Sequence, residues 1–169
     1  MDLNINEGIG AGELMAGAGV LDRPADEFVN DPTLEAVWAV KAFEHAEVYF
    51  NLLCSVDPKI LKLTPVDDQI YAEFRVLFPS LNVAHLNEEE LKNEKAKAEW
   101  RPFCNNYKDV VEDFSFATLL RLKADDEYSS ENSVITPKIQ FLAIELARNR
   151  EGHNCVLRSK FKPKPRQRK

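Results

Sequence analysis

The sequence PKIQFLAIELARNREGHN, residues 137–154, predicts the helix around which the rest of the chain folds. One apolar face of this helix consists of Ile139, Leu142, Ala143, Leu146 and Ala147. Phe141 and Ile144 lie nearly opposite that face. A helix that is apolar on two sides is buried on both, so we expect it at the centre of the core. Gly152 stands where a left-handed helix cap belongs.

The C-terminal half of this helix carries a cluster of polar side chains. Glu145 is a helical neighbour of Arg148 at i, i+3 and of Asn149 at i, i+4. Lone charges are rarely buried on a core helix, so we expect partners for Glu145 and Arg148. The candidate partners of the arginine are Glu99, Asp109, Glu112 and Asp113. The cluster is open to two interpretations, an internal ion-pair lock or a patch that contacts a partner.

Three further helices are predicted on the N-terminal side, over residues 31–58, 64–79 and 87–100. They begin at Asp31–Pro32, at Thr64–Pro65 and at a capping box of Asn87 and Glu90. The apolar stripe of the first is Leu34, Trp38, Ala42, His45, Tyr49, Leu52 and Val56. Pro102 breaks or restarts the third helix. Aromatic anchors at helical spacing follow as Trp100, Phe103 and Tyr107.

The pattern changes period over residues 113–122, DFSFATLLRL, where apolar residues alternate with Ser115, Ala117 and Arg121. This alternation predicts a strand, and residues 133–136 are a short return strand. The sequence therefore predicts a mainly α fold with a small β-hairpin (α+β), as a single compact domain over residues 30–156. A flexible Gly/Ala-rich leader (1–29) precedes this domain, and a disordered basic tail (157–169) follows it.

The charge of the 169-residue chain is unevenly distributed, although its formal net value is only −6. The tail contains seven basic residues and no acid: Arg158, Lys160, Lys162, Lys164, Arg166, Arg168 and Lys169. Residues 1–157 therefore carry about −13, a poor surface for nucleic acid, because phosphate contacts need clustered cations. The tail itself either binds RNA, a ribosome or an import receptor, or is a solvated extension.

The residues that could support chemistry do not combine into a recognisable site. GIGAGELMAGAG (8–19) follows no strand, so it is interpreted as a flexible leader rather than a phosphate loop. The three histidines are isolated, which disfavours a zinc site. Cys104, in the first turn after Pro102, is more simply a small packed residue than a reactive thiol. We predict no catalytic residue, metal ligand or cofactor.

Cellular location is inferred from what the sequence does and does not contain. Three widely spaced cysteines, Cys54, Cys104 and Cys155, are typical of reduced thiols in a cytoplasmic or nuclear protein. No secretory leader is evident, and no apolar run approaches the roughly 18 residues of a membrane span. We expect a cytoplasmic monomer, with the nucleus as a second possible location.

Three stretches carry a family resemblance: VDDQIYAEFR (66–75), AKAEWRPFCNNYKDVVEDFSFATLLRL (96–122) and PKIQFLAIELARNREGHN (137–154). They resemble the polysaccharide biosynthesis domain-containing protein 1 family. Residues 31–58 are similar as well, so the resemblance covers roughly residues 30–155. The motifs WRPFC, VEDF, TLLRL and IELARNREG occur in the same order.

The resemblance implies a small cytosolic protein that is not an enzyme and is mainly helical with a little β-structure. Its expected role is that of a chaperone for the GTP-binding domain of translation elongation factor 1-alpha, nascent or GTP-bound. The candidate partner-binding residues are Trp100, Arg101, Phe103, Arg148, Asn149, Arg150 and Glu151. Alternatively, Trp100 and Phe103 belong to the core and the charged cluster covers them. Other possible functions are a transferase of glycan metabolism, as the family name suggests, and an RNA-associated adaptor acting through the tail.

Overall fold

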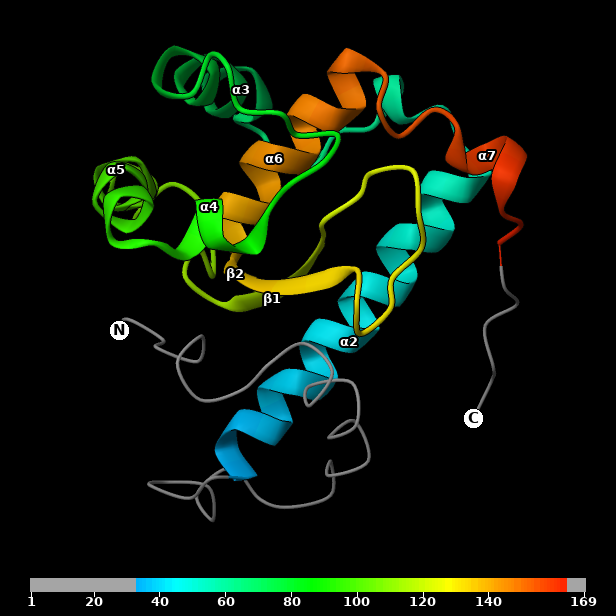
Figure 1. Cartoon of the computed structure of the whole chain (residues 1–169), viewed down its shortest axis with the longest axis horizontal. Helices are drawn as coiled ribbons and strands as arrows, with labels where there is room; N and C mark the ends of the chain where they lie inside the picture. Colours follow the sequence, from blue (N-terminus) through cyan, green and yellow to red (C-terminus); the bar gives the residue numbers. More distant parts are fainter. Residues whose placement is uncertain (1–32, 164–169) are drawn as a thin grey trace.

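The computed structural model describes residues 33–163, and Figure 1 shows their arrangement. The elements in chain order are α2 (Thr33–Ser55), η4 (Pro58–Ile60), α3 (Asp67–Leu77), α4 (Glu88–Lys92), α5 (Glu94–Asn105), β1 (Ala117–Arg121), β2 (Ser133–Pro137), α6 (Lys138–Glu151) and α7 (Leu157–Lys160). The predicted fold class is confirmed, since the domain is mostly helical with one antiparallel two-stranded hairpin. No helix within residues 33–163 is long and apolar enough to cross a membrane.

Helix α6 is the centre of the domain, as its two apolar faces predicted. Every residue from Ile139 to Asn149 is buried. The helix contacts α3, α5 and η4 and also packs on both strands. In Figure 1, α6 lies between the group formed by α3, α4 and α5 on one side and the long helix α2 on the other.

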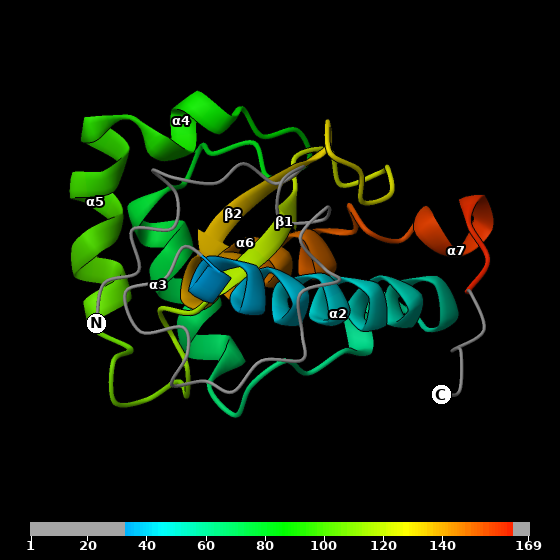
Figure 2. The same ribbon diagram turned by 90° about the horizontal axis from the view of Figure 1, so that it is seen from below.

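The hairpin lies between α2 and α6 and is buried on both faces (Figure 2). Leu119 pairs with Ile135 in the register and packs against a row of small side chains on α2: Ala39, Ala42 and Ala46. Leu120 points into the main core instead. Because neither face of β1 meets solvent, even the polar Arg121 at its end is buried.

The buried face of α2 differs from the predicted stripe. The buried side chains among the described residues of α2 are those of Ala39, Val40, Ala42, Ala46, Tyr49, Leu53 and Cys54. His45 and Leu52, which were predicted in the stripe, are exposed. The buried face is rotated about the helix axis relative to the predicted stripe because the hairpin packs on α2. A strand can approach a helix closely only over small residues such as alanine. The predicted cap at Asp31–Pro32 and the side chains of Leu34 and Trp38 lie outside the described residues.

The start of α3 is two residues later than the sequence predicted, at Asp67 instead of Pro65. The Asp67 carboxylate accepts hydrogen bonds from the backbone nitrogens of Leu63 and Thr64, both at 2.8 Å. The Thr64 hydroxyl also donates to Asp67 Oδ1 and accepts a bond from the backbone nitrogen of Val66. Thr64 therefore belongs to a hydrogen-bonded turn that precedes the helix, and the first residue of α3 is Asp67.

The predicted helix over 87–100 is divided at Asn93, whose side chain accepts a 2.7 Å bond from the Ala96 nitrogen and caps α5. Pro102 neither breaks nor restarts α5, which continues to Asn105. Trp100 and Phe103, on either side of the proline, are both buried in the core. Their packing holds the helical turn that contains Pro102. Cys104 is consequently in the last turn of α5, so the predicted position in a positive first turn is wrong.

The folded part of the chain continues through α7, beyond the boundary predicted at residue 156. Leu157 is fully buried, and the Phe161 ring packs on Phe50 of α2 with centroids 5.6 Å apart. Residues 157–161 therefore pack against α2, and this part of the predicted tail is folded. The leader (1–29) and the tail residues Lys164, Arg166, Arg168 and Lys169 lie outside the described residues.

Replacing Gly152 with alanine should lower the free energy of unfolding by roughly 1 kcal/mol. Gly152 caps the end of α6 with φ at 87°. This left-handed backbone conformation is unfavourable for residues that carry a Cβ atom. An added Cβ would lie 3.8 Å from Lys59 Cε, an ordinary contact, so backbone strain is the main cost. Urea denaturation measures the change. An alanine variant as stable as the wild type would show that this cap carries no strain.

Candidate functional site

The polar end of α6 forms a buried network centred on Glu145. Its Oε1 accepts a 2.9 Å hydrogen bond from Arg148 and a 3.3 Å bond from Arg121. Its Oε2 accepts bonds from the Tyr49 hydroxyl at 2.9 Å and from the Asn154 amide at 2.8 Å. Four donors from four parts of the chain therefore meet on one carboxylate that is completely buried.

Arg148 joins α6 to two other segments through backbone carbonyl groups. Its Nε donates to Val83 O at 2.6 Å, and its Nη2 donates to Arg121 O at 2.6 Å and Leu122 O at 3.1 Å. The four acids predicted as its partners are therefore wrong, because the anion comes from Glu145 on the same helix. Arg148 points toward the end of β1, whereas all four predicted acids are exposed.

Arg121 is the second buried cation of the network. Its guanidinium donates to Ala124 O at 2.6 Å and Asp126 O at 3.1 Å, as well as to Glu145 and Asn154. The Arg121 guanidinium also lies over two aromatic rings. Its Cζ is 5.5 Å from the centroid of the Phe50 ring and 5.8 Å from that of the Tyr128 ring. Two cations thus share one carboxylate, and carbonyl oxygens and π faces stabilise the excess positive charge.

Two asparagines complete the network and connect it to α2. The Asn149 amide donates to the Tyr49 hydroxyl at 3.1 Å, and the Asn154 amide donates to Asn149 Oδ1 at 2.7 Å. Burial raises the pKa of Tyr49 well above its ordinary value, and the charge of Glu145 raises it further. Tyr49 is therefore a neutral donor, and the network connects α2, β1, α6 and the segment after Gly152.

The ionisation of Glu145 should contribute to stability in a pH-dependent manner. Burial alone would raise the pKa of this carboxyl, but the charges of Arg121 and Arg148 and the hydrogen bonds of Arg148 and Asn154 hold it below its ordinary value. A depressed folded-state pKa means that this stabilisation is complete above the unfolded pKa of about 4.3. It is lost as the pH falls through the lower folded pKa.

We therefore expect the stability difference between wild type and Glu145→Gln to be largest at neutral pH and to shrink below about pH 4. Glutamine does not titrate, and the other carboxyl groups are common to both proteins, so their effects cancel. Urea unfolding between neutral and acid pH gives both curves. A difference that stays constant through the acid range would contradict an ionised Glu145 in the folded state.

A second charged group lies nearer the surface, between α3 and the end of α6. Glu151 accepts three bonds, from Arg75 at 2.6 and 2.9 Å and from the Tyr71 hydroxyl at 3.0 Å. Arg75 also donates to two carbonyls of the segment after α3. Arg150 pairs with Asp68 at 2.5 Å and lies over the Tyr71 ring. These contacts fasten α3 to α6 at a surface accessible to solvent.

The WRPF motif of α5 divides between the core and the surface. Trp100 and Phe103 are 5% and 1% exposed and pack around Phe74, with ring centroids 5.5 and 6.5 Å from it. Arg101 and Pro102 are exposed. The two aromatic residues are therefore core residues in this structure.

The seven predicted partner-binding residues do not form one surface. Four are buried, namely Trp100, Phe103, Arg148 and Asn149, and their side chains cannot touch a partner in this conformation. The exposed members are Arg101, Arg150 and Glu151, of which the last two lie together on α6. Direct contact through the predicted set is thus restricted to these three. Of the predicted tail residues, Arg158, Lys160 and Lys162 are exposed at or just after α7.

The sequence prediction missed two members of the buried network: Tyr49 and Arg121. Tyr49 was assigned only to an apolar stripe, and Arg121 only to an alternating strand. An available signal was the position of Arg121 between Leu120 and Leu122, since a charge within an apolar strand buried on both faces needs an internal partner.

The remaining candidates for chemistry are separate from one another. Among residues 33–163, no group of three His, Cys, Asp or Glu side chains is placed to hold a metal ion. The three cysteines, all within the described range, form no disulfide. Burial raises the pKa of the Cys54 thiol, an effect that the charge of Arg121 partly opposes.

Comparisons with known proteins agree on one family. The model of the PBDC1 protein family matches residues 34–159. The chain is 54% identical to human Protein PBDC1 over 85% of its own length and 62% of the human protein. It is 42% identical to the PBDC1 homolog of Schizosaccharomyces pombe, over 77% of this chain and 91% of that one.

A solved structure shows the same fold. The solution NMR structure of a Saccharomyces cerevisiae protein superposes with a TM-score of 0.68 at 40% identity, over 72% of this chain and 86% of that one. The chain spans less than two thirds of the length of its human relative. From the family model, the extent of these identities and the shared fold, the chain belongs to the PBDC1 family.

Proposed function

We propose that this chain is a cytoplasmic, non-enzymatic chaperone that binds the GTP-binding domain of translation elongation factor 1-alpha and assists its folding. The proposal extends the resemblance described for residues 30–155 and is supported by membership of the PBDC1 family. In this proposal the protein acts as a monomer and uses no cofactor.

The observation that carries the proposal is the burial of the densest charged cluster. Arg121, Glu145 and Arg148 are each 0% exposed, and their hydrogen bonds are made to one another, to the buried Tyr49 and Asn154, and to the backbone. A substrate cannot reach a cluster that is closed to solvent and filled by its own contacts. Of the two interpretations of this cluster, its burial favours the internal ion-pair lock, and the exposed surface is where a partner would bind.

That exterior is strongly acidic. Outside the buried network, residues 33–157 contain 20 acidic and 12 basic side chains, because two of the arginines are inside the core. Exposed acids include the run Glu88–Glu90, and also Asp125 and Glu127. A surface of this kind attracts a basic partner and accelerates their encounter, which suits a basic translation factor.

The test is the refolding of the isolated GTP-binding domain of elongation factor 1-alpha, diluted from denaturant with or without this chain. We expect the chain to raise the yield of nucleotide-binding client in proportion to its concentration. We also expect isothermal titration calorimetry to give affinities that differ between GTP- and GDP-loaded client. An unchanged yield together with no binding in either nucleotide state would overturn the proposal, as would a melting temperature raised by nucleotide sugars.

A secondary role for the basic tail, contact with ribosomal RNA, is supported by the cations that follow α7. Arg158, Lys160 and Lys162 are exposed, and the buried Leu157 fixes the point from which they extend. Removing residues 158–169 should abolish ribosome co-sedimentation at low salt without affecting binding of the purified client. Unchanged co-sedimentation would exclude the tail as an RNA contact.

A further inference from the structure

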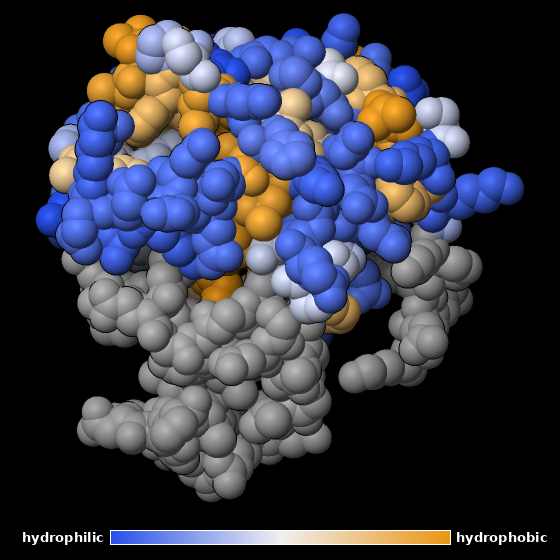
Figure 3. All heavy atoms as spheres, viewed as in Figure 1, coloured by the Kyte–Doolittle hydropathy of each residue, from blue (hydrophilic) through white to orange (hydrophobic). Residues whose placement is uncertain are grey.

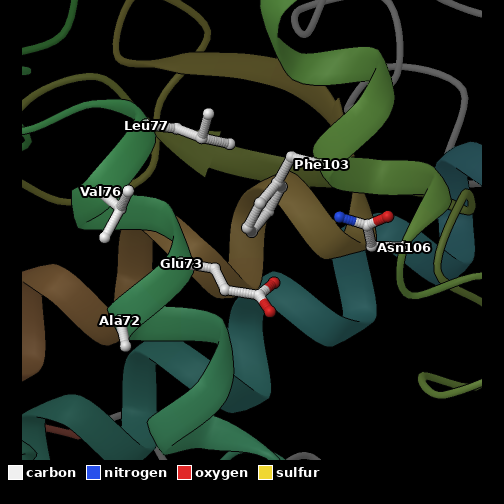
Figure 4. Close-up of a pocket in the computed structure, with 6 residues that line it drawn as sticks. All are labelled: Ala72, Glu73, Val76, Leu77, Phe103 and Asn106. Carbon is white, nitrogen blue, oxygen red and sulfur yellow. The ribbon is translucent and has the colours of Figure 1, made fainter.

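A hollow between α3 and α5 combines exposed apolar side chains with one carboxylate. It measures about 340 Å³ and is lined by Ala72, Glu73, Val76, Leu77, Phe103 and Asn106 (Figure 4). Pockets that enclose small molecules commonly measure roughly 300–1,000 Å³, so this hollow has room for a few side chains. Figure 3 shows hydrophobic side chains reaching the surface in the region of α3.

The apolar side chains at this hollow are unusually accessible. Val76 is 80% exposed and Leu77 is 50% exposed. Arg75, directly before them, is bonded to Glu151 on α6. In Figure 4 they extend from α3, while Phe103 and Asn106 come from α5 and its end. Phe103 is itself 1% exposed, so it closes the base of the hollow rather than its rim.

The carboxylate of Glu73 lies between the two helices and points across toward Asn106 (Figure 4). The Tyr107 hydroxyl donates to its Oε2 at 2.5 Å, and the Gln69 amide lies 3.4 Å from its Oε1. Burial raises the pKa of Tyr107, and the hydrogen bond to Glu73 raises it further, so this donor remains a neutral phenol. Both donors orient the carboxylate, and neither neutralises its negative charge.

We propose that this hollow, lined by α3 and α5, is a docking site for an amphipathic helix of a partner protein that carries a lysine or arginine beside its aliphatic side chains. The aliphatic groups cover Ala72, Val76 and Leu77, and the cation pairs with Glu73. A helix laid in a groove between two helices is a common recognition mode, anchored by residues at i, i+3 and i+4. The net negative exterior favours the same occupant over an acidic one.

The site is independent of the elongation factor as a client and is tested with a synthetic probe. The probe is a short fluorescein-labelled helical peptide with leucines at i, i+3, i+4 and i+7 and lysines beside them. Matched peptides replace the leucines with serine or the lysines with glutamate. Fluorescence anisotropy measures their binding to the full chain, and ¹H–¹⁵N NMR locates the site.

We expect the leucine–lysine peptide to bind, with chemical-shift changes centred on Ala72, Val76 and Asn106. Val76→Ser should weaken binding by about tenfold or more. The matched control is Ile60→Ser, because Ile60 is another apolar side chain, 72% exposed, that does not line the hollow. Glu73→Gln keeps an acceptor for Tyr107 but should reduce the preference for the lysine peptide over the glutamate peptide.

Equal binding by the Val76→Ser and Ile60→Ser variants, or shifts spread over the acidic surface without the hollow, would overturn the docking site. Unfolding curves of each variant show whether the fold is intact. If the peptide binds here while the elongation factor domain neither binds nor refolds better, the docking site holds and the proposed function fails. If the domain binds with undiminished affinity to Val76→Ser, the proposed function holds without this site.

Discussion

Arg148→Ala should destabilise the fold by roughly 3–5 kcal/mol, the cost of breaking a buried ion pair by removing one partner. The substitution removes the 2.9 Å bond to Glu145 and leaves the carbonyls of Val83, Arg121 and Leu122 without this donor. A typical domain has only about 5–15 kcal/mol of stability, so the variant should be at the edge of unfolding at room temperature. Urea denaturation followed by circular dichroism measures the loss.

Arg150→Ala is the matched control, two residues further along the same helix. Its pair with Asp68 is largely exposed, with side-chain exposures of 36% and 95%, and such pairs contribute about 0–1 kcal/mol. A partner-contact role makes the opposite prediction, in which Arg148→Ala unfolds like the wild type but loses binding. That result would show that the conformation in which Arg148 is buried is not the one that binds.

Phe103→Ala should cost roughly 3–5 kcal/mol through the cavity that it leaves in the core. The ring packs among other aromatic rings, with centroids 5.6 Å from Trp100, 5.3 Å from Tyr107 and 6.5 Å from Phe74. The helix–helix contact of α3 and α5 depends on these rings, so the loss should be global rather than local. Thermal and urea unfolding should give concordant changes.

The neighbouring Arg101→Ala serves as the control for this motif. Arg101 is exposed, and surface substitutions of this kind usually change stability by about 0.5 kcal/mol or less. If both variants unfold like the wild type, Phe103 is not held in the core. If Arg101→Ala alone weakens binding of the elongation factor domain, the motif combines a structural residue with a surface contact.

The central helix and the hairpin were predictable because their signals are local. The apolar faces of residues 138–151 and the glycine after them specify a buried, capped helix from the sequence alone. Helix boundaries were less predictable. Asp67 could either cap a helix or begin one, and only its bonds to the preceding turn decide between these possibilities.

The candidate site was predictable in composition but not in geometry. The sequence places Glu145 beside Arg148 and requires partners for both. It cannot show that Arg121, 24 residues before Glu145, reaches the same carboxylate, because that contact depends on how β1 packs on α6. The sequence is equally limited in predicting exposure. Arg148 and Arg150 are two residues apart, yet Arg148 is buried and Arg150 is exposed.

The buried network also bears on when the domain can fold during its own synthesis. Tyr49 and Glu145 are 96 residues apart in sequence, and Asn154 follows the whole of α6. Helix α2 therefore leaves the ribosome long before the groups that enclose it have been made. Closing such a long loop carries an entropic cost that only the completed cluster can offset. Assembly of this core must therefore wait until residue 154 has emerged from the ribosome.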